Sequence, residues 1–182
     1  MCHTTLLNAN FYAFLHLIDK DLAAKTQAGG CRRCRSTLHK NRFPRKPRGA
    51  PAGVVEPFRQ SLRCSKCNKR HTPPSVRWLG PKVYLGAIVV LASALRAGLT
   101  NQRAAHLAEC INVPKRTIER WRTWWLRDFG ESAFWKNARA RLMPPIAVAA
   151  LPAGLLERFG GPDLSSQLVA VLRFLTPLNE GG

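Results

Sequence analysis

Two Cys-x-x-Cys pairs, Cys31 with Cys34 and Cys64 with Cys67, constrain the fold of this chain more than any other feature. In each pair the two-residue spacer lets both sulfurs point at one ion, and two such pairs complete a tetrahedral site of four thiolates. The interval between the pairs is long for a ribbon, and no Gly follows Cys34, so we expect a small β ribbon with an inserted loop. Four thiolates leave no ligand position open, which predicts one structural Zn2+ per chain.

Two alternatives to the four-thiolate site stay open at the level of the sequence. Either His39 or His71 could replace one thiolate, because both lie close to the cysteine pairs along the chain. The cysteines could instead be unliganded thiols. Disulfides are not expected, because the chain carries no convincing secretory signal and cysteines in a reducing compartment are more often ligands or thiols.

The charge of the chain points to a polyanionic partner. With 29 Lys plus Arg against 10 Asp plus Glu, the net charge is +19. Much of this excess falls between Cys31 and Lys82, a segment whose single acid is Glu56. Because such a surface repels itself unless counter-charge is near, nucleic acid is the expected partner.

The segment between the cysteine pairs is rich in Arg, Lys, Pro and Gly. Its prolines exclude a regular helix, so we expect an exposed basic loop that contacts phosphate or orders only on binding. Phe58 to Cys64 alternates in polarity and predicts a short strand that leads into the second pair. The residues expected to bind phosphate are Arg32, Arg33, Arg35, Arg45, Lys46 and Arg48.

The stretch from Gln102 to Arg127, QRAAHLAECINVPKRTIERWRTWWLR, has the spacing of a helix-turn-helix. Asn112 suits the left-handed position of the turn, and Pro114 suits the first position of the second helix. The outward face of that helix would enter the major groove of DNA, where basic side chains read guanine edges or grip phosphate. We expect Lys115, Arg116, Thr117 and Arg120 to lie on this face, and the Trp residues of the same helix to lie in the core.

The run KRTIERW resembles the second helix of the helix-turn-helix in bacterial transposases and related mobile-element proteins. The resemblance implies a DNA-binding protein associated with transposition, acting as an accessory, regulatory or end-recognition factor. A nuclease centre is not expected, because no convincing set of metal-binding carboxylates and no His-x-His pair with a tyrosine is found. An RNA-binding zinc-ribbon protein and an interaction subunit of a mobile-element complex remain as alternatives.

These features predict a mainly α fold with a trihelical helix-turn-helix domain, a small β zinc ribbon and flanking helices. The expected segments are an amphipathic helix in 1–28, the ribbon in 29–78, the helix-turn-helix in 79–142 and a helical tail in 143–182. The apolar stretch Val83 to Leu95 reads as a buried helix and is too short to cross a membrane. We expect a cytoplasmic, nucleoid-associated protein whose partners are double-stranded DNA and, as candidates, a separate transposase and a second copy of the chain.

Overall fold

The computed structural model describes residues 5, 8–49, 53–79, 84–96 and 113–179. Within these residues the chain is mainly helical, with one small antiparallel sheet of strand order β1-β2-β3, which confirms the expected fold class at that level. The chain forms two compact units, one of residues 7–86 and 172–182 and the other of residues 1–6 and 87–171. The N-terminal helix and the ribbon, expected as separate segments, therefore belong to one unit.

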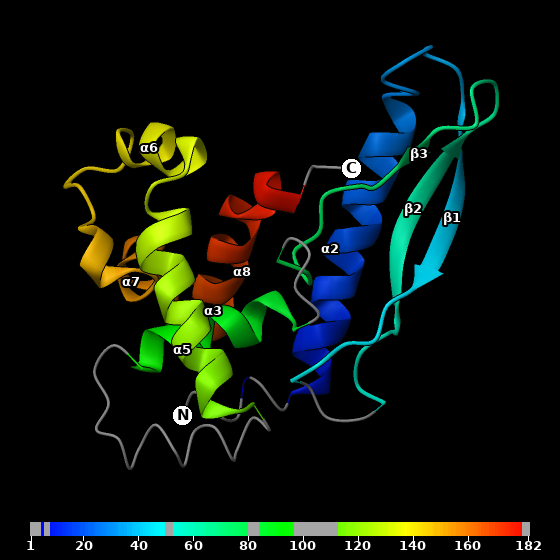
Figure 1. Cartoon of the computed structure of the whole chain (residues 1–182). Helices are drawn as coiled ribbons and strands as arrows, with labels where there is room; N and C mark the ends of the chain where they lie inside the picture. The colour runs from blue at the N-terminus through cyan, green and yellow to red at the C-terminus, as the bar shows by residue number, and fades with distance from the viewer. Residues whose placement is uncertain (1–4, 6–7, 50–52, 80–83, 97–112, 180–182) are drawn as a thin grey trace. The chain divides into compact units, whose positions relative to one another are not determined.

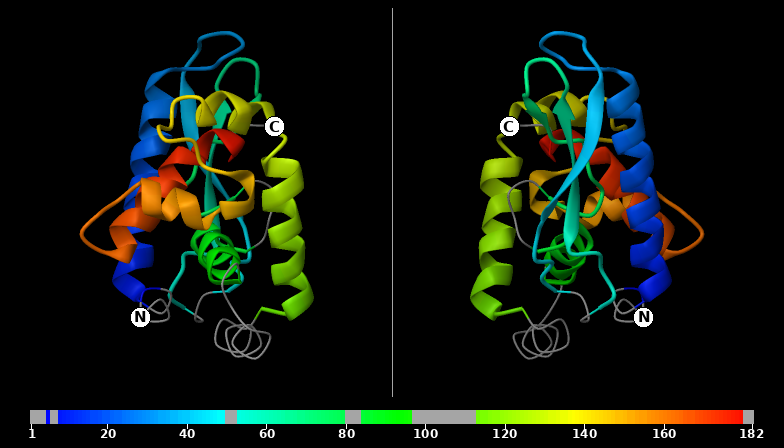
Figure 2. Two further views of the ribbon diagram at one scale, coloured as in Figure 1. Left: turned by 90° about the vertical axis from the view of Figure 1, so that its left-hand side faces the viewer. Right: turned by 90° about the vertical axis from the view of Figure 1, so that its right-hand side faces the viewer.

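Helix α2 spans Ala9–Ala28 and packs alongside the sheet of its own unit (Figures 1 and 2). It begins where the Asn8 side chain accepts a hydrogen bond from the Asn10 amide at 2.9 Å, which satisfies an otherwise unpaired amide of the first turn. The predicted amphipathic helix is thus present, although Phe14 is 50% exposed and lies outside its buried face. Asp19 is buried on that face instead.

The sheet consists of β1 Leu38–Pro44, β2 Phe58–Cys64 and β3 Arg70–His71. The predicted strand at Phe58–Cys64 is confirmed, and β1 pairs with it over its whole length, from Leu38 opposite Cys64 to Pro44 opposite Phe58. The expectation of a wholly irregular basic loop was therefore wrong for its first part. An edge strand tolerates a proline and a row of exposed cations, because one of its sides pairs with no other strand.

A buried polar network joins α2 to the segment that follows the sheet. Arg77 Nε lies 2.7 Å from Asp19 Oδ2, and both side chains are almost completely buried. The remaining donors of Arg77 bind the Glu56 and Phe58 carbonyl oxygens, while Asp19 also accepts from the Ser75 hydroxyl and the Val76 amide. Each of the three side-chain nitrogens of Arg77 and each carboxylate oxygen of Asp19 thus has a hydrogen-bond partner, which offsets part of the cost of burying two charges.

Helices α3 and α5 belong to the other unit over nearly all of their length. Helix α3 spans Gly86–Arg96, and its residues Ala87–Ser93 are all buried, as the apolar stretch predicted. Helix α5 spans Lys115–Trp124 and continues without a break into a π-helical turn, η1, at Trp125–Phe129. No local pattern predicted that turn, which brings bulky side chains together.

An aromatic cluster surrounds the π-helical turn. The Phe129 ring centroid lies 4.8 Å from that of Trp125, 5.3 Å from Trp135 and 5.6 Å from Trp124. Trp121 and Trp125 are buried, which confirms their predicted place in the core, whereas Trp124 is only partly buried. Trp135 of the following helix is buried as well, which was not predicted.

The rest of the described chain is made of short helices. The Ser132 side chain accepts a hydrogen bond from the Trp135 amide at 3.1 Å and begins α6. None of the helices in the described part of the chain has the length and apolar character to cross a membrane. The remaining elements are α6 Ala133–Arg139, η2 Val148–Ala150, α7 Ala153–Arg158, α8 Leu164–Phe174 and η3 Thr176–Asn179.

Candidate metal centre and nucleic-acid interface

The four predicted cysteines come together at one end of the sheet. Cys31 and Cys34 lie in the turn between α2 and β1, Cys64 ends β2, and Cys67 lies in the turn before β3. All four Sγ atoms lie within 4.8 Å of one another, and all four cysteines are free of disulfides. This group can hold a metal ion.

The sulfur separations fit tetrahedral coordination. Cys31 Sγ lies 3.6 Å from Cys67 Sγ, and Cys34 Sγ lies 3.4 Å from Cys64 Sγ. A tetrahedron with metal–sulfur bonds of about 2.3 Å has edges of about 3.8 Å, whereas a disulfide bond is only about 2.05 Å long. The donor set is therefore prepared for a metal that accepts four soft ligands.

The two cysteine turns have the same backbone design. The Cys31 amide donates to the Ser36 carbonyl at 2.9 Å, and the Cys64 amide donates to the Lys69 carbonyl at 3.0 Å, so each first cysteine is bonded five residues ahead. The residue after each second cysteine is left-handed, with φ of 57° at Arg35 and 60° at Asn68. Asn tolerates this conformation, whereas for Arg it costs about 1–2 kcal/mol. The missing Gly therefore does not prevent the first turn from forming.

The pKa values of the thiols differ widely, and a bound cation would allow all four to lose their protons. Hydrogen bonds from the side chain and backbone of Ser36 lower the pKa of Cys34 to about 6. At Cys67 a hydrogen bond with the Lys69 backbone lowers the pKa of the thiol. Burial and hydrogen bonds with the other cysteines outweigh this effect and raise the pKa to about 11. Four adjacent thiols cannot all ionise alone, because each thiolate disfavours the next. A divalent ion among them removes that conflict.

His71 lies at the edge of the cysteine group. Its Nε2 atom is 3.3 Å from Cys31 Sγ, within hydrogen-bond distance, whereas the group of close ligand atoms in the described residues contains cysteines only. His39 is exposed on β1, opposite Arg63. The geometry thus places His71 beside a ligand, as a partner for its sulfur, and favours four thiolates over a site in which histidine replaces one of them.

Basic side chains cover the ribbon. Arg59 and Arg77 are buried, and the exposed cations of the described ribbon are Arg32, Arg33, Arg35, Lys40, Arg42, Lys46, Arg48, Arg63, Lys66, Lys69 and Arg70. Five of the six residues expected to bind phosphate are in this set. Arg45 is not, because it is half-buried with its guanidinium 4.6 Å from the centroid of the Trp78 ring, and burial lowers its pKa. Its position indicates a structural role that charge counting missed.

The exposed face of α5 carries three of its four predicted DNA contacts. Lys115, Arg116 and Arg120 are exposed. Thr117, expected on the same face, is only 7% exposed, and its hydroxyl accepts a hydrogen bond from Arg120 Nη2 at 3.3 Å. The prediction for Thr117 was wrong because its position joins the buried face of the helix, one turn before Trp121. Thr117 can therefore orient Arg120 rather than contact a base.

The first helix and turn of the predicted helix-turn-helix, residues 102–112, lie outside the described residues. Pro114 precedes α5 and its carbonyl accepts from the Thr117 amide at 2.8 Å. The helix thus begins one residue later than predicted. Helix ends are ordinarily defined only to within one or two residues, so this difference is not significant.

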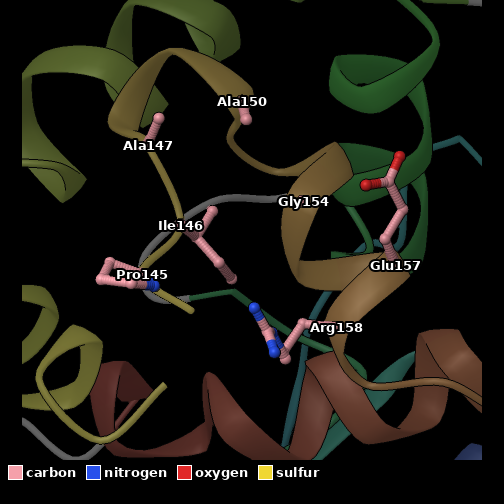
Figure 3. A pocket seen from close by; sticks show the side chains of 7 residues that line it. All are labelled: Pro145, Ile146, Ala147, Ala150, Gly154, Glu157 and Arg158. Atoms are coloured by element: carbon pink, nitrogen blue, oxygen red, sulfur yellow. The ribbon is translucent and has the colours of Figure 1, made fainter. Parts of the chain in front are cut away.

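A pocket of about 390 Å3 lies beside α7 (Figure 3). It is lined by Pro145, Ile146, Ala147, Ala150, Gly154, Glu157 and Arg158. The Arg158 guanidinium donates to the carbonyl oxygens of Met143 and Pro144. The Arg158 side chain therefore holds the loop at Met143 and Pro144. The residues that line the pocket include no cluster of reactive groups.

Comparisons with known proteins found no matching family model, no similar curated protein and no similar solved structure.

Proposed function

We propose that this chain is a DNA-binding protein in which a structural zinc ion holds a basic ribbon and helix α5 reads the DNA sequence. We assign it to transposition, as an accessory, regulatory or end-recognition factor without a nuclease centre of its own. The assignment to mobile elements rests on the KRTIERW run of α5.

Zinc is the metal that suits the cysteine group best. It has no redox chemistry, accepts four thiolates in a tetrahedron and stabilises small folds that lack a large core. The sheet around the cysteines fits this description, because its local core consists of Leu38, Leu62 and the cysteines themselves. A site with four protein ligands has no place for a substrate, so the metal would be structural.

The observation that carries the proposal is the exposed positive charge of the ribbon. Its exposed Lys and Arg side chains stand in a segment with Glu56 as its one acid. The negatively charged phosphate oxygens of DNA complement this positive surface. Release of the counterions bound to those phosphates drives binding with little dependence on the DNA sequence. Lys115, Arg116 and Arg120 of α5 would add the contacts that distinguish one sequence from another.

The test starts by selecting a preferred duplex from random DNA and comparing it with a scrambled duplex. Arg116→Ala and Arg120→Ala should each relax the discrimination between the two duplexes by about 1–3 kcal/mol. Arg127→Ala is the matched control, because Arg127 is exposed in the π-helical turn η1 that continues α5, and its replacement removes the same charge. Equal effects of all three variants on both duplexes would contradict the assignment of α5.

Competition with structured RNA tests whether the partner is DNA or RNA. At about 150 mM salt, where weak phosphate contacts are screened, the preferred duplex should outcompete RNA. Preferential binding of RNA would overturn the DNA assignment while leaving the metal site intact.

A further inference from the structure

We propose that the two cysteine turns form a single DNA-backbone-binding surface, and that metal binding assembles this surface. The knuckle surface is defined here as Arg32, Arg33, Arg35, Lys66 and Lys69. The inference rests on the proposed metal site and on duplex DNA as the partner. It adds residues of the second turn to the contacts and couples metal binding to DNA binding.

The metal ligands bring the knuckle surface together. Arg32 and Arg33 lie between Cys31 and Cys34, and Lys66 lies between Cys64 and Cys67, so convergence of the four sulfurs within 4.8 Å makes the two tips neighbours. The Ser65 amide also donates to the Thr37 carbonyl at 3.0 Å, which ties one turn to the other. Cations far apart in the sequence thus share one end of the ribbon.

Positive charge dominates this end of the ribbon. All five side chains of the knuckle surface are exposed. Glu56 lies beyond the opposite end of the hairpin, because Phe58 pairs with Pro44 while Cys64 pairs with Leu38. Seven residues of extended strand place that carboxylate about 20 Å away. The knuckle cations also outnumber the two net negative charges that four thiolates leave on a divalent ion.

The proposed metal ion would hold the two turns together. Arg35 and Asn68 both adopt left-handed backbone conformations without glycine. The four sulfurs, two from each turn, lie within 4.8 Å of one another and face a common centre, where one ion would link the two turns. Removal of the ion would take away this link and leave the left-handed Arg35 without compensation, so we expect the tips to separate and the shared phosphate-binding surface to disappear.

The experiment uses the full-length chain and a duplex of arbitrary sequence, so that base reading by α5 does not contribute. Binding is followed by fluorescence anisotropy over a series of salt concentrations. Removing one phosphate-binding cation should reduce the slope of log K against log salt by about 0.9. Arg32→Ala with Arg33→Ala, and Lys66→Ala with Lys69→Ala, should each reduce the slope by about 2, and the fourfold variant by about 4.

The control is Lys20→Ala with Lys25→Ala, which removes two exposed cations of α2 in the same unit. Its slope should stay within about 0.5 of the unaltered protein, since neither residue belongs to the knuckle surface. The inference is overturned if the second-turn variant has the same slope as this control. That outcome is distinct from failure of the proposed function, which is judged on discrimination between sequences.

Metal dependence is tested directly by a chelator. The metal-free chain should show a slope as low as that of the fourfold variant. Because linkage is reciprocal, saturating DNA should raise zinc affinity, measured by competition with a chelating dye, by the same factor by which zinc raises DNA affinity. A metal-free protein that binds DNA with the unaltered slope and affinity would refute the coupling.

Discussion

Asp19 and Arg77 form a buried ion pair with 2.7 Å between Oδ2 and Nε, and they join α2 to the segment after the sheet. Their burial makes the pair sensitive to removal of one member, because the other charge would remain without its counterpart. Asp19→Asn should therefore lower the free energy of unfolding by about 3–5 kcal/mol, measured in urea. Asp21→Asn, an exposed neighbour on the same helix, should cost less than about 0.5 kcal/mol. Equal stability of the two variants would contradict this role.

The metal content of the purified protein tests the cysteine group. We expect about one zinc ion per chain by mass spectrometry, because four protein thiolates fill one tetrahedral site. Cys64→Ser should abolish stoichiometric zinc, since Cys64 is a buried member of the group. Cys2→Ser is the matched control and should retain the metal. Retention of the same fold without metal after reduction and chelation would refute the structural role of zinc.

His71 should strengthen metal binding through Cys31. Its Nε2 atom lies 3.3 Å from the Cys31 sulfur, so the ring can donate to the thiolate and hold it in place. Removal of such a partner typically weakens metal affinity by about 10–100-fold, which is the effect expected for His71→Ala in a chelator competition. His39→Ala, an exposed histidine of the same sheet, should leave affinity unchanged. If both variants bind zinc equally, His71 has no part in the site.

Adjacent cations in the ribbon should behave differently. Arg45 stacks over Trp78, so Arg45→Ala should lower the free energy of unfolding by about 0.5–2 kcal/mol by removing this cation–π interaction. Lys46 is exposed, and Lys46→Ala should leave thermal stability unchanged while weakening binding to every duplex. A stable Arg45→Ala protein whose only defect is DNA affinity would restore the phosphate-binding role expected from the sequence.

Removal of the Phe129 ring should open a cavity in the aromatic cluster. Phe129 is 1% exposed and its ring lies against three tryptophan rings. Phe129→Ala should cost about 3–5 kcal/mol in urea unfolding. Phe14→Ala, which truncates a half-exposed ring on α2, is the control and should cost less than about 1 kcal/mol. A similar cost for both would show that the cluster contributes little to stability.

Local patterns in the sequence determined much of this protein. The spacing within each Cys-x-x-Cys pair predicted that the sulfurs would converge, because a two-residue spacer leaves few other ways to place them. Ser132 marked the start of α6, since a side-chain acceptor there satisfies a free helix amide. Periodicity located α2 and β2, because it reports which side of an element leaves water, and a continuous apolar stretch located the buried α3.

Tertiary structure alone decided which charged and polar side chains are structural. Charge counting could not distinguish the buried Arg77 and the stacked Arg45 from exposed Arg48, because their partners, Asp19 and Trp78, lie far away in the sequence. Pairing with β2 likewise turned a proline-rich basic segment into strand β1. Tertiary packing also buried Thr117, and it gathered the aromatic rings of Trp125 and Phe129 at the π-helical turn. Local sequence limits which conformations a segment can adopt, whereas long-range contacts decide which of its side chains remain in water.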